Sequence, residues 1–206
     1  MSNNSLASLL QTISGQKALF ENLGEFICHY ASIEKHCHLI FDNLSGLPRD
    51  VARSIMGGSQ LSNLLPVLTR IIDLGDMDDD QKAEYHKCID HLNAITTLRH
   101  TLIHRGAEVT TTGIVSSNEL LARSKESIEI LSLHADDIKA AADDCRNISL
   151  RLILLIAPSV RVDLDAESEK AIFRPWRYKP VQPDRPHQPP RSTRRSKPRQ
   201  RPSSQK

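Results

Sequence analysis

One short stretch of this sequence, Leu98–Gly106, concentrates the side chains best suited to binding an anion and moving a proton. It reads Leu-Arg-His-Thr-Leu-Ile-His-Arg-Gly, so Arg99 and His104 stand five positions apart and His100 lies between them. A guanidinium can hold an oxyanion through paired hydrogen bonds, and an imidazole can take up or release a proton near neutral pH. These residues are therefore the first candidates for a functional site.

Helix geometry limits what this pair can do within one helix. Five residues of an ideal α-helix turn through about 500°, which leaves Arg99 and His104 roughly 140° apart around the axis. His100 and His104, four positions apart, are neighbours on the helix surface. Arg99 and His104 meet at one ligand only if the arginine curls around the helix or a second copy contributes. The structural alternative is that Arg and His in a last helical turn complement the helix dipole and cap its free carbonyls.

The stretch resembles the motif of the HEPN superfamily of helical domains. In that motif an arginine, a polar residue and about three further residues precede a histidine near the end of a late helix. Arg99–His104 follows this spacing, with His100 as the polar residue. The surroundings are similar too, with a long first helix that contains Tyr30–Glu34, a helical hairpin, the motif helix and a following long helix. The resemblance covers roughly residues 15–157.

The resemblance implies metal-independent RNA cleavage. Active HEPN enzymes pair two protomers so that their motifs share one composite cleft, and their product carries a 2′,3′-cyclic phosphate. In this chain His104 would be the general acid or base at the ribose 2′-hydroxyl or the leaving 5′-oxygen, while Arg99 would clamp the phosphate and stabilise the transition state. His100 would orient the pair or bind a neighbouring phosphate. Arg105 would add positive charge, and Glu34 would hold Arg99 or His104 in place.

The implied biological role is a toxin or phage-defence endoribonuclease. RNA would be the substrate, a homodimer the active form, and an antitoxin or other protein a partner. The family also includes members that only bind or assemble, so the second hypothesis is a non-catalytic helical module that binds protein or RNA. Exposure of Arg99 and His104 in a shared groove favours the enzyme. Burial of both in ion pairs or cap contacts within one protomer favours the module.

Hydrophobic periodicity predicts the helices that position this stretch. Apolar residues recur at steps of three and four, which is the spacing of one helix face. The pattern covers residues 19–44, 50–56, 61–72 and about 80–104. The acidic run Asp76–Asp80 precedes the last of these, and carboxylates at that place favour a helix N-terminus.

After Gly106 the sequence predicts a small β-arm and then a second long helix. Residues 107–116 are rich in β-branched side chains, and Ser116 with Glu119 matches a capping box at a helix start. Sevenfold apolar spacing then continues to about Ala157. The expected fold class is an all-α, up-down helical bundle over residues 1–160, with long first and last helices.

Charge divides the chain into an acidic body and a basic tail. Residues 171–206 hold 11 of the 27 basic side chains and one of the 25 acidic ones, so residues 1–170 keep 16 and 24. Residues 161–206 also hold eight of the 11 prolines, and they lack the apolar surface to offset their ordering entropy. We expect a disordered Pro/Arg-rich tail that binds RNA or docks a partner. Its nucleic-acid-binding candidates are Trp176, Arg177, Tyr178, Lys179, Arg194 and Arg195.

Other functions lack their sequence marks. There is no Gly-rich phosphate loop, GxSxG or HExxH, so no cofactor is expected. Histidines and cysteines crowd two helices, but adjacent positions point to different faces, and we expect core thiols and solvated histidines rather than a metal site. These residues are Cys28, His29, His36, Cys37, His38, His86, Cys88 and His91. The sequence shows no bilayer-spanning run and no signal peptide, and its free thiols favour the cytoplasm, without a membrane partner.

Overall fold

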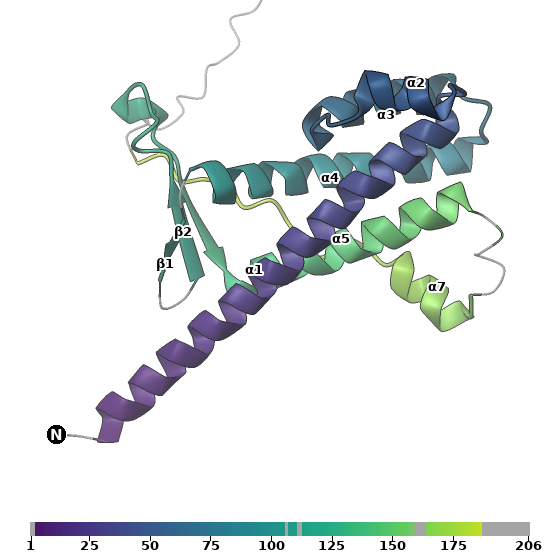
Figure 1. Ribbon diagram of the computed structural model, residues 1–206. Helices are drawn as coiled ribbons and strands as arrows, with labels where there is room; N and C mark the ends of the chain where they lie inside the picture. The colour runs from purple at the N-terminus through teal and green to yellow at the C-terminus, as the bar shows by residue number, and fades with distance from the viewer. Residues whose placement is uncertain (1–2, 106, 111–112, 158, 160–163, 187–206) are drawn as a thin grey trace, which may run out of the picture.

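A long helix, α1 (Asn3–Leu44), runs diagonally across the protein and organises the fold (Figure 1). The computed structural model describes residues 3–105, 107–110, 113–157, 159 and 164–186, with side chains from residue 16 onward. α5 (Ala135–Ile156) packs along α1, and α3 (Leu61–Leu74) and α4 (Asp79–His104) pack against each other beside them. The short helix α2 (Arg49–Met56) links α1 to α3.

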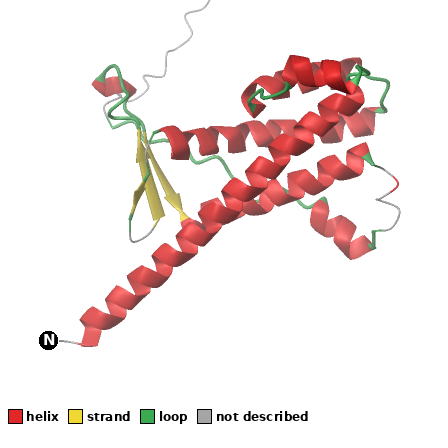
Figure 2. Ribbon diagram, in the orientation of Figure 1, coloured by secondary structure: helices red, strands yellow, loops and turns green. Residues whose placement is uncertain are grey.

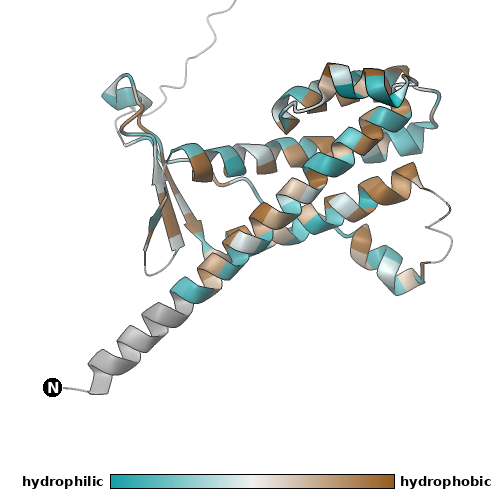
Figure 3. Cartoon of the chain, viewed as in Figure 1, coloured by the Kyte–Doolittle hydropathy of each residue, from teal (hydrophilic) through white to brown (hydrophobic). Residues whose placement is uncertain are grey.

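The core face of α1 follows the predicted stripe. Its apolar residues recur at three- and four-residue steps, and Figure 3 shows hydrophobic and hydrophilic residues alternating along the helix. The buried members are Leu19, Phe26, Tyr30, Ile33, Cys37, Ile40 and Phe41. Ile27, which the periodicity placed with them, is instead 36% exposed. The helix also begins at Asn3, well before the predicted start at residue 19.

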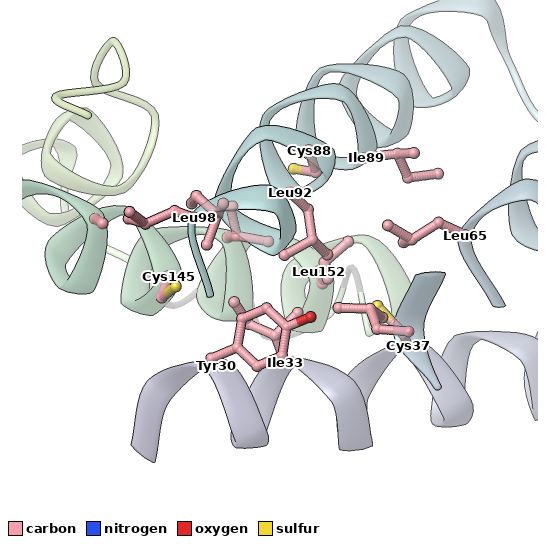
Figure 4. Packing of buried hydrophobic residues seen from close by; sticks show 14 of the residues in the cluster. Tyr30, Ile33, Cys37, Leu65, Cys88, Ile89, Leu92, Leu98, Cys145 and Leu152 are labelled. Carbon is pink, nitrogen blue, oxygen red and sulfur yellow. The ribbon is translucent and has the colours of Figure 1, made fainter. Parts of the chain in front are cut away.

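Side chains from α1, α3, α4 and α5 meet in one hydrophobic core (Figure 4). The residues labelled there include Ile33, Cys37, Leu65, Cys88, Leu92, Leu98, Cys145 and Leu152. Leu98 and Leu102 lie in the same turns of α4 as the candidate motif, and their side chains are buried in this core. Burial of these two leucines fixes the rotation of α4 and leaves the motif side chains facing outward.

The two ends of α4 confirm the predicted boundaries. Asp78 is the N-cap, and its Oδ1 accepts a hydrogen bond of 2.7 Å from the backbone N–H of Gln81. This bond satisfies one of the free donors of the first turn, and Asp79 and Asp80 complement the helix dipole there. The helix ends at His104, which is the predicted end of the pattern, and Arg105 is its C-cap.

A three-stranded antiparallel sheet lies at the end of α4, so the fold is mostly helical but not all-α (Figure 2). Its strands, in the order β1-β2-β3, are β1 (Glu108–Val109), β2 (Gly113–Ser117) and β3 (Ile130–His134). The first two strands agree with the expected β-arm.

The third strand replaces the first part of the predicted last helix, which begins only at Ala135. In β3, buried Leu131 and Leu133 alternate with exposed neighbours, which is the period of a strand and not of a helix. The pairing of Gly113 with His134 explains the glycine, since a Cβ there would lie 1.9 Å from the carbonyl oxygen of Leu133.

The C-terminal segment, residues 164–186, packs against the body, whereas disorder was expected from residue 161 onward. It contains α7 (Ala166–Ile172) and then an extended stretch whose Asp184 forms an isolated antiparallel bridge with Ile130. The prediction weighed low apolar content and missed the polar contacts that hold this segment. Residues 187–206, with the remaining part of the predicted tail, lie outside the described residues.

Asp144 of α5 is the main buried anchor for this segment. Its carboxylate is fully buried and accepts hydrogen bonds from His91 Nε2 at 2.9 Å, Arg174 Nη1 at 2.9 Å and the backbone N–H of Tyr178 at 2.8 Å. Burial raises the pKa of Asp144, but these bonds, with one from the backbone of Arg177, lower it by more than burial raises it and leave it below its usual value. The carboxylate is therefore charged and neutralised in place.

Arg151, about two turns further along α5, is the second anchor for this segment. It is 4% exposed, and its guanidinium donates to the carbonyl oxygens of Ile172 and Arg174 and to Glu84 of α4. The same guanidinium lies 3.9 Å from the ring centroid of Trp176. One buried arginine thus ties the C-terminal segment to two helices of the body.

Candidate functional site

The predicted motif opens into a hollow of about 520 Å³ between α1, α3 and the end of α4. Arg99, His100 and His104 all line it, although Arg99 and His104 are far apart around an ideal helix. The remaining lining residues are Tyr30, Glu34, Gln60, Leu61, Ser62, Thr96, Thr97, Thr101 and Arg105. A single protomer therefore brings the motif side chains around one space.

Arg99 lines this hollow and lies over an aromatic ring. Its Cζ is 5.7 Å from the ring centroid of Tyr30, which is within the range of a cation–π contact. The Tyr30 hydroxyl donates to Oγ1 of Thr96 at 3.2 Å. Burial is the largest effect and raises the pKa of Tyr30, while the bond to Thr96 lowers it by less. The pKa therefore lies above its usual value, and the phenol is neutral at physiological pH.

The guanidinium of Arg99 keeps its hydrogen-bond donors for a ligand. Across the described part of the chain it makes no hydrogen bond and no ion pair, and the Tyr30 ring fixes its position without consuming an N–H. A half-buried arginine held in this way is a ready acceptor of an anion, since its planar fork can bind two phosphate oxygens at once.

The two motif histidines lie side by side and are both exposed. Their ring centroids are 4.6 Å apart with an interplanar angle of 44°, as expected for positions i and i+4 of a helix. Both residues are exposed, so their rings are accessible to a ligand in the hollow. His100 stands between Arg99 and His104 around the helix, which makes the three side chains a continuous basic surface.

We expected Glu34 to hold Arg99 or His104. Glu34 does line the hollow, but its carboxylate bonds to a different partner. Its Oε1 accepts a 3.2 Å hydrogen bond from the backbone N–H of Leu61, the first residue of α3. Gln60, the N-cap of α3, makes no side-chain capping bond, so Glu34 supplies that acceptor from a neighbouring helix. The carboxylate therefore fixes α3 against α1 at the edge of the site.

Arg105 also lines the hollow, and its charge is largely compensated. Its Nη1 lies 2.8 Å from Glu129 Oε2, and the other oxygen of Glu129 is 2.6 Å from Arg185 Nη2. The hydrogen bond from Arg105 is the largest cause that holds the pKa of Glu129 below its usual range. Arg105 thus joins the motif to the C-terminal segment more than it adds free positive charge.

The aromatic residues predicted to stack on nucleic acid are engaged within the protein instead. Tyr178 is 4% exposed and belongs to the hydrophobic core. Trp176 stacks on His91 with ring centroids 4.7 Å apart and an interplanar angle of 1°. Neither ring can stack on a base without leaving these contacts, so the predicted role of both in binding nucleic acid stays a prediction.

The basic residues of the same set have mixed outcomes. Arg177 pairs with Asp143 at 2.8 Å on the surface, and Lys179 is exposed. Arg194 and Arg195 lie outside the described residues, so their predicted role in binding nucleic acid stays a prediction.

Sequence reasoning missed several residues of the site. It assigned Tyr30 to the core stripe, and it gave no signal for Thr96 or for Gln60 and Ser62 at the start of α3. Thr96 could have been found, because it lies four positions before His100 and thus on the same side of α4. The contribution of α3 depends on how it docks on α1, which no local pattern specifies.

Three of the four cysteines are buried, and the described cysteines and histidines outside the hollow are not arranged as a metal site. Burial raises the pKa of Cys37 and of Cys88 to about 12, and raises that of Cys145 further, while Cys28 is exposed. Within the described residues no group of three His, Cys, Asp or Glu side chains is placed to hold a metal ion. None of the described helices combines the length and the apolar character needed to cross a bilayer.

Comparison with known proteins adds no family: no family model, curated protein or solved structure matches this chain. The resemblance to the HEPN superfamily therefore stays a prediction that depends on the motif and its position.

Proposed function

We propose that this protein is a metal-independent endoribonuclease whose site is the hollow at the end of α4. The observation that carries the proposal is the convergence of Arg99, His100 and His104 on one accessible space in a single protomer. Exposure in a groove was the outcome expected for an enzyme. Burial of Arg99 and His104 in ion pairs or caps was the outcome expected for a module without activity, and neither side chain has such a partner among the described residues.

The chemistry needs the phosphate to be bound, a proton to be removed from the 2′-hydroxyl and a proton to be given to the leaving 5′-oxygen. The hollow supplies Arg99 for the first task and His104 for one of the two proton transfers, and water would carry the proton in the other. Arg99 would bind the scissile phosphate and stabilise the additional negative charge of the transition state. His104 would remove the proton from the ribose 2′-hydroxyl as its oxygen attacks phosphorus, or protonate the 5′-oxygen as the P–O5′ bond breaks. His100 would orient this histidine or bind the adjacent phosphate. The product ends would be a 2′,3′-cyclic phosphate and a 5′-hydroxyl.

The local charge supports an anionic substrate. Residues 1–170 are acidic overall, yet this hollow gathers two histidines and the guanidinium of Arg99 against the single carboxylate of Glu34, while Arg105 is paired with Glu129. A basic patch on an acidic body directs a polyanion to that place and away from the rest of the surface. A composite cleft between two protomers, a toxin or phage-defence role and an antitoxin partner remain predictions from the HEPN resemblance.

A substrate-side experiment tests the proposal. Purified protein in EDTA is incubated with a 5′-labelled single-stranded RNA and with the same strand carrying 2′-deoxyribose at every cleaved position. We expect cleavage of the RNA, 2′,3′-cyclic phosphate ends, and no cleavage at the deoxyribose positions. Cleavage of the substituted strand would contradict the mechanism. RNA retention in a gel-shift assay without any cleavage would favour the binding module.

A further inference from the structure

A second cavity, of about 190 Å³, adjoins the hollow along α4. It lies between α4, β3 and the extended stretch that follows α7, which runs beside α4 toward the sheet (Figure 1). Thr97, Thr101 and Arg105 line both cavities, and their spacing of four residues places them in one row on the surface of α4. We call this second cavity the side pocket. A single row of side chains separates it from the hollow.

The row between the two cavities is low. Thr101 is 5% exposed and therefore projects little from the helix. Thr97 is exposed, but its side chain is short and its Oγ1 donates to the carbonyl oxygen of Asn93 at 3.1 Å. Arg105 ends the row, and Glu129 holds its guanidinium at 2.8 Å. A flexible ligand can thus cross the row, with one part in the hollow and another part in the side pocket.

The walls of the side pocket are mostly apolar and come from both the body and the C-terminal segment. They include Leu98, Leu131, Pro180, Val181 and Pro183. The extended stretch is held on both sides of its wall residues. The backbone N–H of Tyr178 donates to Asp144 at 2.8 Å, and Asp184 and Ile130 exchange backbone hydrogen bonds of 2.9 and 2.8 Å. The contacts that anchor the C-terminal segment therefore also fix one wall of this pocket.

Arg105 and Glu129 add a hydrogen-bonding pair to this apolar pocket. Arg105 donates through Nη1 to Glu129 Oε2 at 2.8 Å, and Arg185 donates to Oε1 through Nε at 3.1 Å and Nη2 at 2.6 Å. A carboxylate offers about four acceptor sites, and a guanidinium has more N–H donors than the one that Arg105 uses for Glu129. Among the described residues, these bonds leave an acceptor site on Oε2 and further donors on Arg105 for a ligand.

We propose that the side pocket holds one unpaired base of the RNA while Arg99 binds the adjoining scissile phosphate, an inference that rests on the proposed nuclease function. The apolar walls cover the faces of a flat base, and the Arg105–Glu129 pair meets its edge, where every base presents hydrogen-bonding groups. The volume is below the roughly 300–1,000 Å³ of pockets for drug-sized ligands, which suits a single base. A base enters only when it is unpaired and unstacked, so we expect single-stranded RNA to be cut and duplex RNA to be spared.

Strands with one cleavable position test this proposal on the full-length protein. Each strand is 2′-deoxy except for a single ribonucleotide, which fixes the scissile phosphate, and one nucleotide at a time is made abasic. An abasic site at one of the two nucleotides that flank this phosphate should lower kcat/KM about 10-fold or more, as for loss of a hydrogen bond to a charged group. An abasic site several nucleotides away should have no effect. Equal rates for all strands would overturn the side pocket and leave the nuclease proposal standing, whereas no cleavage of any strand would overturn both.

A variant that fills the side pocket should slow the intact strand alone. Val181 lines the side pocket but not the hollow. We expect Val181→Trp to lower the rate for the intact strand to that for the flanking abasic strand and to leave the abasic rate unchanged, whereas a folding defect would slow both strands. The matched control is Val51→Trp, because Val51 is 44% exposed on α2 and lines neither cavity.

A milder variant, Glu129→Gln, decides the question if Val181→Trp does not fold. Glu129 also lines the side pocket and not the hollow, and the variant should slow the intact strand more than the abasic strand. Its control is Asp143→Asn, since the side chains of Glu129 and Asp143 are 19% and 23% exposed and each pairs with an arginine. Slowing of both strands to the same extent, or of neither, by a folded pocket variant would overturn the proposal.

Discussion

Replacing Asp144 should cost far more stability than replacing its neighbour Asp143. Asp144 is fully buried and accepts bonds from His91, Arg174 and the backbone of Tyr178. Asp143 is partly exposed and pairs with Arg177, whose side chain is 59% exposed. The two residues are adjacent on α5, have the same chemistry and differ in burial, so they form a matched pair.

The structure sets the expected size of the difference. Removing one member of a buried, hydrogen-bonded charge cluster leaves its partners unpaired and typically costs about 3–5 kcal/mol. A surface pair of the Asp143 type contributes about 0–1 kcal/mol. Asp144→Ala should therefore lower the free energy of unfolding by about 3–5 kcal/mol, and Asp144→Asn by somewhat less because the amide keeps one acceptor oxygen. Asp143→Ala should change it by less than about 1 kcal/mol.

Urea denaturation followed by circular dichroism measures these values, and limited proteolysis locates the change. In Asp144→Ala we expect early cleavage within residues 164–186, since this carboxylate anchors that segment. Equal urea midpoints for the Asp144 and Asp143 variants would show that the C-terminal segment is not held through Asp144. Equal protease resistance would lead to the same conclusion.

Two further predictions concern ionisation. The pKa values of Asp144 and Glu129 are lowered in the folded protein, so both carboxylates stabilise it above their ordinary pKa of about 4, and that stability is lost as the pH falls through the lowered values. The urea midpoint should hold between pH 7 and 5 and fall below about pH 4, less steeply in Asp144→Asn; a midpoint that rises on acidification would contradict this. For the thiols, Ellman's reagent at pH 8 should label Cys28 rapidly and Cys37, Cys88 and Cys145 only after unfolding, because burial raises the pKa of these three. Rapid labelling of more than one thiol in the native protein would refute that assignment.

The helices of the body were predictable because their signals are local. The stripe from Leu19 to Phe41 and the Asp78 cap of α4 are visible in the order of residues alone. The strand β3 was not predictable, because Ile130–His134 pairs with residues 13 or more positions earlier in the chain. Its short alternation of buried and exposed residues also fitted the apolar spacing of the helix that follows, so the two were predicted as one helix. Strands are specified by their partners more than by their own sequence.

The C-terminal segment shows a different limit. Its composition is that of a disordered chain, yet two buried charged residues of α5, Asp144 and Arg151, supply the contacts that hold it. Nothing in the local pattern of α5 distinguishes those two side chains from solvent-exposed ones. The placement of Trp176 and Tyr178 in a free tail followed from the same error, since both rings pack against the body.

The candidate site was partly predictable. Arg99, His100 and His104 were found by residue type and spacing, and the hollow that they share depends on the docking of α3 and α1, which placed Tyr30 beneath Arg99. Glu34 was assigned to the right place but with the wrong partner, since its carboxylate caps α3. Side-chain partners across helices depend on packing, which spacing within one helix cannot give.

The rate of RNA cleavage by His104→Ala in EDTA, compared with wild type and with His38→Ala, tests the central claim most directly. His38 lies on α1 outside the hollow, so its replacement removes an imidazole without touching the site. We expect His104→Ala to lose at least about 100-fold in rate, as for loss of a general acid or base, with the helical spectrum and RNA affinity retained, and His38→Ala to keep the wild-type rate. Cleavage by His104→Ala at the wild-type rate would contradict the assignment of this histidine and of the hollow as the active site.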